Sequence, residues 1–128
     1  MPKKNTEKIA SEIVDAAFHV HKEMGPGLLE SVYQICLMIE LKSRAINFQS
    51  QFPIPLIYKG VILNKEFKVD FLVEQEILLE LKSVESILPL HQAQIISYLK
   101  LSGKHLGLLI NFNSPLIKNG IRRFVNNY

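Results

Sequence analysis

The spacing of apolar residues changes from helical to alternating near residue 48, and this change restricts the fold more than any other feature. The apolar residues before it recur every three or four positions, at Ile9, Ile13, Ala17, Val20 and Met24. This spacing predicts an amphipathic helix, capped by Asn5 or Thr6 and ended by Gly25-Pro26-Gly27. A second helix is expected from about Leu28 to Arg44. Apolar residues cover most of its circumference, as is typical of a helix buried among other elements.

Three alternating segments follow the change. Their apolar members are Phe52, Ile54, Leu56 and Tyr58, then Phe67, Val69, Phe71 and Val73, then Ile77, Leu79 and Leu81. Alternation predicts strands whose apolar residues share one face. Pro53 and Pro55 remove backbone donors, which predicts that the first strand lies at a sheet edge. Lys59-Gly60 and residues 74–76 are expected to form the two connecting turns.

The last third of the chain predicts a crossover connection. Pro89 and Gly103 bound a third helix, and the apolar run 105–112 is typical of a strand buried on both faces. A helix between two strands permits parallel pairing. The order α-α-β-β-β-α-β therefore predicts an α/β fold with a mixed four-stranded sheet flanked by helices. The tail is expected to end in a short helix at Ile121–Asn126.

Composition predicts one domain, over residues 1–128, without disulfides or a cysteine-based zinc site. The chain has 128 residues, of which 48% are hydrophobic, and one cysteine. No signal peptide or membrane-spanning run is visible, so a cytoplasmic location without membrane contact is expected. The net charge is +3, but residues 86–128 carry five bases and no acid. Such a basic third would suit a polyanionic partner, although scattered solubilising bases explain it as well.

The second and third strands bring two acids together. If both strands place their apolar residues on one face, a three-residue connection pairs Val73 with Ile77. Asp70 then lies opposite Glu80, with Cβ atoms about 4.5–5.5 Å apart. Two carboxylates at that distance need a proton or a cation between them, and oxygen ligands favour Mg²⁺ or Mn²⁺. Lys82 projects from the same face, although a solvated polar hairpin face would show the same pattern.

Asp70 followed by Glu80-Leu81-Lys82 resembles the PD-(D/E)xK nuclease superfamily, and within it the small bacterial GxxExxY branch. The motif that names this branch stands at Gly27-Leu-Leu-Glu30-Ser-Val-Tyr33. The other matching segments follow in the order and spacing of that branch: Tyr58–Gly60, Val69–Glu74, Leu79–Ser83, Gln94–Lys100 and Gly107–Phe112. The resemblance covers about residues 9–125. The proline that usually precedes the aspartate is replaced by Val69.

The resemblance implies a restriction-endonuclease-like core and a metal-dependent nuclease. Asp70, Glu80 and the backbone carbonyl of Leu81 would hold Mg²⁺ or Mn²⁺, and Glu30 would reach the same ion directly or through water. Lys82 would be the catalytic lysine. Two residues on one face of the third helix, Gln94 and Tyr98, stand where the superfamily often has accessory site residues.

Nucleic acid is the expected substrate, with DNA preferred over RNA. The alternative is a nucleic-acid-binding or protein-interaction module on the same fold with little or no turnover. A homodimer or a protein partner, as in toxin–antitoxin or defence systems, is also left open.

Overall fold

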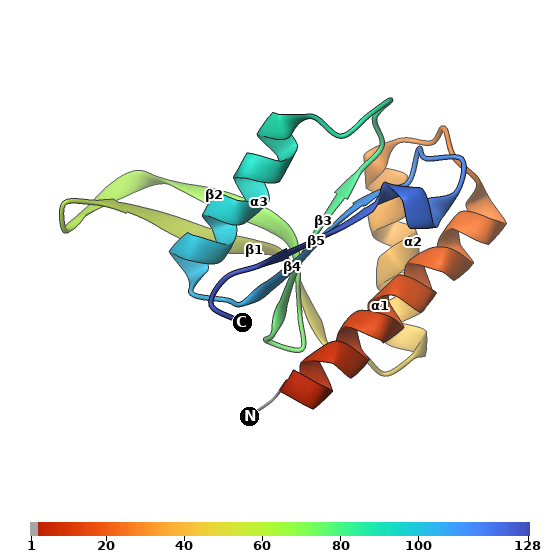
Figure 1. The fold of residues 1–128 in the computed structure, drawn as a ribbon, viewed down its shortest axis with the longest axis horizontal. Coiled ribbons are helices and arrows are strands. Elements are labelled where there is room, and N and C mark those ends of the chain that lie inside the picture. The colour runs from red at the N-terminus through yellow and green to blue at the C-terminus, as the bar shows by residue number, and fades with distance from the viewer. Residues whose placement is uncertain (1–2) are drawn as a thin grey trace.

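The computed structural model describes residues 3–128, which form three helices and one five-stranded sheet (Figure 1). The elements are α1 (Lys3–Met24), α2 (Glu30–Ser43), β1 (Phe48–Tyr58), β2 (Val61–Val73), β3 (Ile77–Lys82), α3 (Pro89–Ser102), β4 (Leu106–Asn111), the 3₁₀ turn η1 (Ile117–Gly120) and β5 (Ile121–Val125). Among these residues, no helix combines the length and apolar character needed to cross a bilayer.

The sheet has the order β1-β2-β3-β4-β5 and is mixed, as predicted. β3 and β4 pair in parallel across the α3 crossover, and the other neighbours pair antiparallel. One apolar cluster joins α1 and α2 to one face of the sheet, and a second joins α3 to the other face. All six residues of β4 are buried, as expected for a strand covered on both sides.

The predicted count of four strands is wrong, because residues 121–125 form β5 instead of a short helix. β5 pairs with β4 from Leu106 to Ile110, so it covers what would be an open sheet edge. Ile121 packs against the first apolar cluster and Phe124 against the second. A spacing of three residues is also typical of a helix. In the structure, however, this short segment finds its backbone hydrogen-bond partners on β4.

The starts of α1 and α2 also differ from the predictions. α1 begins at Lys3, before Asn5 and Thr6, and the hydroxyl of Thr6 donates to the Glu76 carboxylate at 3.1 Å. α2 begins at Glu30, not Leu28, because the Leu28 N–H donates to the Tyr33 hydroxyl and Leu29 has extended backbone angles.

The predicted edge strand and turns are confirmed. β1 lies at the sheet edge and carries both prolines, where missing N–H donors cost least. Lys59 and Gly60 both have positive φ, 50° and 78°, as a two-residue hairpin turn requires. α3 ends at Gly103 in the left-handed region, with φ 73°.

One expectation about β2 is wrong, since its alternating apolar residues do not all share a face. Phe71 and Val73 belong to the α1–α2 cluster, whereas Val69 belongs to the α3 cluster. The change falls at Asp70, where β3 stops pairing with β2 and the β1–β2 hairpin continues alone (Figure 1). On β1, Gln51 stands between the residues paired with Val69 and Phe71 and has a left-handed φ of 53°. Two-stranded ribbons twist more than wider sheets, which accounts for the exchange of faces.

Candidate active site

Asp70 and Glu80 lie where β2 and β3 separate. The predicted register is confirmed up to that point, with Val73 opposite Ile77 and Phe71 opposite Leu79. One step further, Glu80 Oε1 accepts a hydrogen bond of 2.8 Å from the Asp70 N–H. Asp70 Oδ2 in turn accepts one of 2.8 Å from the Leu81 N–H. Each side chain therefore binds the backbone of the opposite strand, and both residues are less than a tenth exposed.

Burial makes the ionised form of both carboxyl groups costly. Loss of solvent is the largest cause that raises the pKa of Glu80 to about 7, and the charge of Asp70 adds to it. Loss of solvent also raises the pKa of Asp70, against the opposing effects of the Leu81 N–H, Lys82 and Gln34. Two buried acids with raised pKa values form a site suited to a proton or a cation.

Glu30 and Lys82 complete the electrostatic setting. Glu30 is the first residue of α2, and burial raises its pKa while the charge of Lys82 lowers it. Lys82, the last residue of β3, favours the ionised form of all three carboxyl groups. Within residues 3–128, however, no three acidic, histidine or cysteine side chains stand as a preformed metal-binding group. Thus Asp70 and Glu80 are joined by a hydrogen bond from the Asp70 N–H to the Glu80 carboxylate, whereas Glu30 interacts with them only through its charge.

The two predicted residues of α3 face the same region. Burial raises the pKa of Tyr98, and the charges of Glu80 and Asp70 raise it further. Gln94, one turn earlier, lines a groove together with Tyr98 and Phe67. Neither makes a hydrogen bond to the carboxylates among the described residues. Their position is consistent with contacts to a bound substrate.

Two glutamines that sequence reasoning missed contact Asp70. Gln34 Nε2 donates to Asp70 Oδ1 at 3.1 Å. A signal for it was available, because Gln34 follows Glu30 by four residues and so shares its helix face. Gln51 also hydrogen-bonds Asp70, which lowers the pKa of that carboxyl group. Nothing in the sequence indicated Gln51, since the pairing of β1 with β2 was not known.

The segment between α1 and α2 is held by Tyr33. Its hydroxyl donates to the Gly25 carbonyl and accepts from the Leu28 N–H at 3.1 Å. Its ring stacks on Phe112, with centroids 4.6 Å apart. The Ser83 hydroxyl, next to Lys82 in sequence, donates to the Leu28 carbonyl. Tyr33 is thus a buried packing residue whose polar end fixes the start of α2, where Glu30 lies.

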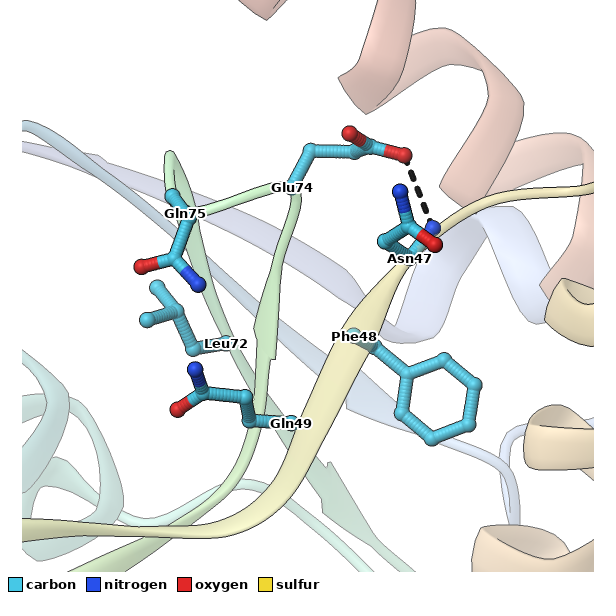
Figure 2. A pocket seen from close by; sticks show the side chains of 6 residues that line it. All are labelled: Asn47, Phe48, Gln49, Leu72, Glu74 and Gln75. Atoms are coloured by element: carbon cyan, nitrogen blue, oxygen red, sulfur yellow. Dashed lines mark hydrogen bonds between the residues drawn. The ribbon is translucent and has the colours of Figure 1, made fainter.

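A pocket at the turn between β2 and β3 is not part of this site. It has a volume of about 330 Å³, and Figure 2 shows its lining residues, Asn47, Phe48, Gln49, Leu72, Glu74 and Gln75. Its one acid, Glu74, already accepts a hydrogen bond of 2.7 Å from the Asn47 N–H. None of the predicted site residues lines it.

Comparison with known proteins identifies both a family and a fold. A family model described as the PD-(D/E)XK nuclease superfamily matches residues 7–124. The crystal structure of SSO0001 superposes with a TM-score of 0.51 at 19% sequence identity. The match covers 73% of this chain and 47% of that one, so this chain spans about half the length of its structural relative. No curated protein matches the sequence significantly.

Proposed function

Since this chain belongs to the PD-(D/E)XK nuclease superfamily, we propose that it hydrolyses phosphodiester bonds in nucleic acid with Mg²⁺ or Mn²⁺. The observation that carries the proposal is that two adjacent carboxyl groups are buried where β2 and β3 separate: Glu80 accepts from the Asp70 N–H, and Asp70 accepts from the Leu81 N–H. The two backbone N–H groups could be satisfied without burying an acid, so their hydrogen bonds alone do not account for two acids kept out of solvent side by side.

The available donors fit a hard divalent cation. Asp70, Glu80 and Glu30 offer carboxylate oxygens, which Mg²⁺ and Mn²⁺ prefer. Glu80 Oε2 accepts no hydrogen bond from any described residue, so it is available to an ion. The Leu81 N–H faces Asp70, and in a strand the carbonyl of a residue lies on the same edge as its N–H. Asp70, Glu80 and the Leu81 carbonyl would therefore hold the ion, with Glu30 reaching it directly or through water.

Each remaining residue has a role that its surroundings support. A bound divalent ion supplies a water of lowered pKa and neutralises charge on the phosphate. The Lys82 ammonium, beside three carboxyl groups, would orient the attacking water and stabilise the pentavalent oxyanion. The Tyr98 hydroxyl is protonated at neutral pH, and burial together with the charges of Glu80 and Asp70 raises its pKa further, so it can donate to a phosphate oxygen. Gln94, on the same helix face, would be a second donor.

Cleavage assays on purified protein test the proposal. The substrates are single- and double-stranded DNA, RNA and branched DNA, each with Mg²⁺, Mn²⁺ or EDTA. We expect divalent-dependent cleavage that Asp70→Asn and Lys82→Ala each abolish. Lys42→Ala, which changes an exposed lysine of α2, serves as the matched control and should retain activity. Cleavage that is equal in wild type and in both site variants would reject the assignment.

Several finer features remain part of the proposal. The Gly27–Tyr33 segment supports the GxxExxY branch of the superfamily. A preference for DNA over RNA, a single domain and a cytoplasmic location stay predictions from the sequence.

A further inference from the structure

A groove lies between Phe67 of the β1–β2 hairpin and the α3 residues from Leu90 to Tyr98. Its volume is about 170 Å³, and it is lined by Phe67, Leu90, Ala93, Gln94, Ser97 and Tyr98. The Phe67 and Tyr98 rings stand 5.1 Å apart, centroid to centroid, at 54°. Phe67 is 37% exposed and Leu90 is 63% exposed, so the apolar walls are open to a ligand.

The groove lies near the candidate active site. Tyr98 is one of its walls, and the charges of Glu80 and Asp70 act on the Tyr98 hydroxyl. The opposite wall is Phe67, three residues before Asp70 on β2, in the part of the hairpin that extends beyond β3 (Figure 1). A strand bound at the carboxylates would therefore have the groove beside it.

We propose that this groove receives an unpaired base of the nucleic-acid strand whose phosphate lies at Asp70 and Glu80. This inference rests on the proposed function and names its substrate class as single-stranded or locally unpaired nucleic acid. Phe67 and Leu90 offer exposed apolar contact, and the largely buried Tyr98 forms the wall behind Phe67. Gln94 and Ser97 offer polar groups to the edge of a base. A base within a duplex has both faces stacked, so it cannot make these contacts without leaving the helix.

Charge on the hairpin supports a nucleic-acid occupant. Between Gln51 and Val69 it carries Lys59, Lys65 and Lys68 against one acid, Glu66. All four side chains are exposed. An excess of lysine on the hairpin that carries Phe67 fits a single-stranded occupant, since cations attract phosphates while bases stack on aromatic rings.

Fluorescence anisotropy with two labelled oligomers separates base contacts from phosphate contacts. One is oligothymidylate, and the other is an abasic deoxyribose-phosphate oligomer of equal length. Both are measured in EDTA, so that no hydrolysis occurs. We expect oligothymidylate to bind more tightly. Phe67→Ala should lower its affinity by about 5- to 150-fold, the usual range for one stacked base, and leave abasic binding unchanged.

Leu90→Ala provides a second variant that is safe for folding, because this side chain is mostly exposed. Leu101→Ala is its matched control, since Leu101 is also an exposed leucine of α3 and does not line the groove. Leu90→Ala should weaken oligothymidylate binding, and Leu101→Ala should not. Equal affinity for the two oligomers, no single-strand binding, or equal effects of the two leucine variants would overturn the inference.

The failure of this inference can be distinguished from the failure of the hydrolase proposal. Base-dependent binding by a protein that cleaves nothing in Mg²⁺ would remove the hydrolysis and leave the groove assignment standing. Metal-dependent cleavage together with equal affinity for oligothymidylate and the abasic oligomer would support the hydrolase proposal and remove the groove assignment.

Discussion

The backbone N–H of Asp70 donates a hydrogen bond to the side chain of Glu80, at 2.8 Å across the end of the β2–β3 ladder. Together with the bond from the Leu81 N–H to Asp70, it replaces the backbone pairing that would otherwise continue there. The two carboxyl groups thus hold the ends of β2 and β3 together, although burial disfavours their ionised forms. Ionisation of these groups should therefore lower the stability of the metal-free protein and favour the binding of a metal ion.

The first prediction concerns Glu80→Gln in the metal-free protein. The folded pKa of about 7 lies above the unfolded value of 4.5. The contribution of Glu80 to stability is therefore fully present below about pH 4.5 and is lost as the pH rises through about 7. Glutamine keeps an acceptor for the Asp70 N–H without the charge, so it should raise the free energy of unfolding at pH 8 by up to about 3 kcal/mol. Urea denaturation in EDTA at pH 5 and pH 8 measures it, with the exposed Glu85→Gln as control. Identical pH profiles for wild type and Glu80→Gln would contradict it.

The second prediction concerns metal binding and pH. Because an ion must displace the proton of Glu80, affinity for Mn²⁺ should fall by up to about tenfold per pH unit below about 7. The midpoint of thermal unfolding should therefore rise with MnCl₂ at pH 8 and rise much less at pH 5.5. Asp70→Asn should show little response at either pH. A rise that is equal at both values, or equal in the variant, would indicate binding elsewhere.

The third prediction is that Gln34 positions Asp70. Gln34→Met keeps the length of the side chain and removes the donor to Asp70 Oδ1. Partners of this kind typically account for 10- to 100-fold in metal affinity, so we expect a loss of about that size for Mn²⁺. Isothermal titration measures it, and the exposed Gln49→Met is the control. Restored affinity in Gln34→Asn is not expected, because the shorter side chain cannot span the 3.1 Å contact. Unchanged affinity in Gln34→Met would remove Gln34 from the site.

The fourth prediction is that Tyr33→Phe destabilises the protein without disturbing its ring stack. The change removes the hydroxyl that joins the Gly25 carbonyl and the Leu28 N–H, but phenylalanine can still stack on Phe112. We expect a loss of about 1–3 kcal/mol in the free energy of unfolding, measured by urea denaturation. Tyr58→Phe, at a side chain that is 64% exposed, should lose much less. Similar losses in both would show that the buried hydroxyl contributes little.

The local periodicities predicted most of the fold because they reflect which side chains can be buried together. Pro53 and Pro55 indicated an edge strand, and Pro89 and Gly103 bounded a helix, since each residue restricts the backbone whatever surrounds it. The segment 121–125 was predicted as a helix because its pattern is too short to separate the two periods. Its pairing with β4, far away in the sequence, decided in favour of a strand.

The candidate site was predictable in part for the same reason. Counting along one hairpin places Asp70 next to Glu80, because a short turn fixes the register. Gln51 reaches Asp70 through the pairing of β1 with β2, and Gln34 through the packing of α2 on the sheet. Neither contact follows from spacing within a single element.

The sequence by itself determined the element types, the edge position of β1 and the register that brings the two acids together, because these depend on neighbours within a few residues. Only the tertiary structure decided that β2 stops pairing with β3 at Asp70, that its apolar residues change faces there, and that both acids are buried. That outcome depends on β3 pairing with β4 on its other side and on the hairpin twisting freely beyond its last partner. These are long-range pairings, and no local pattern of side chains encodes where they end.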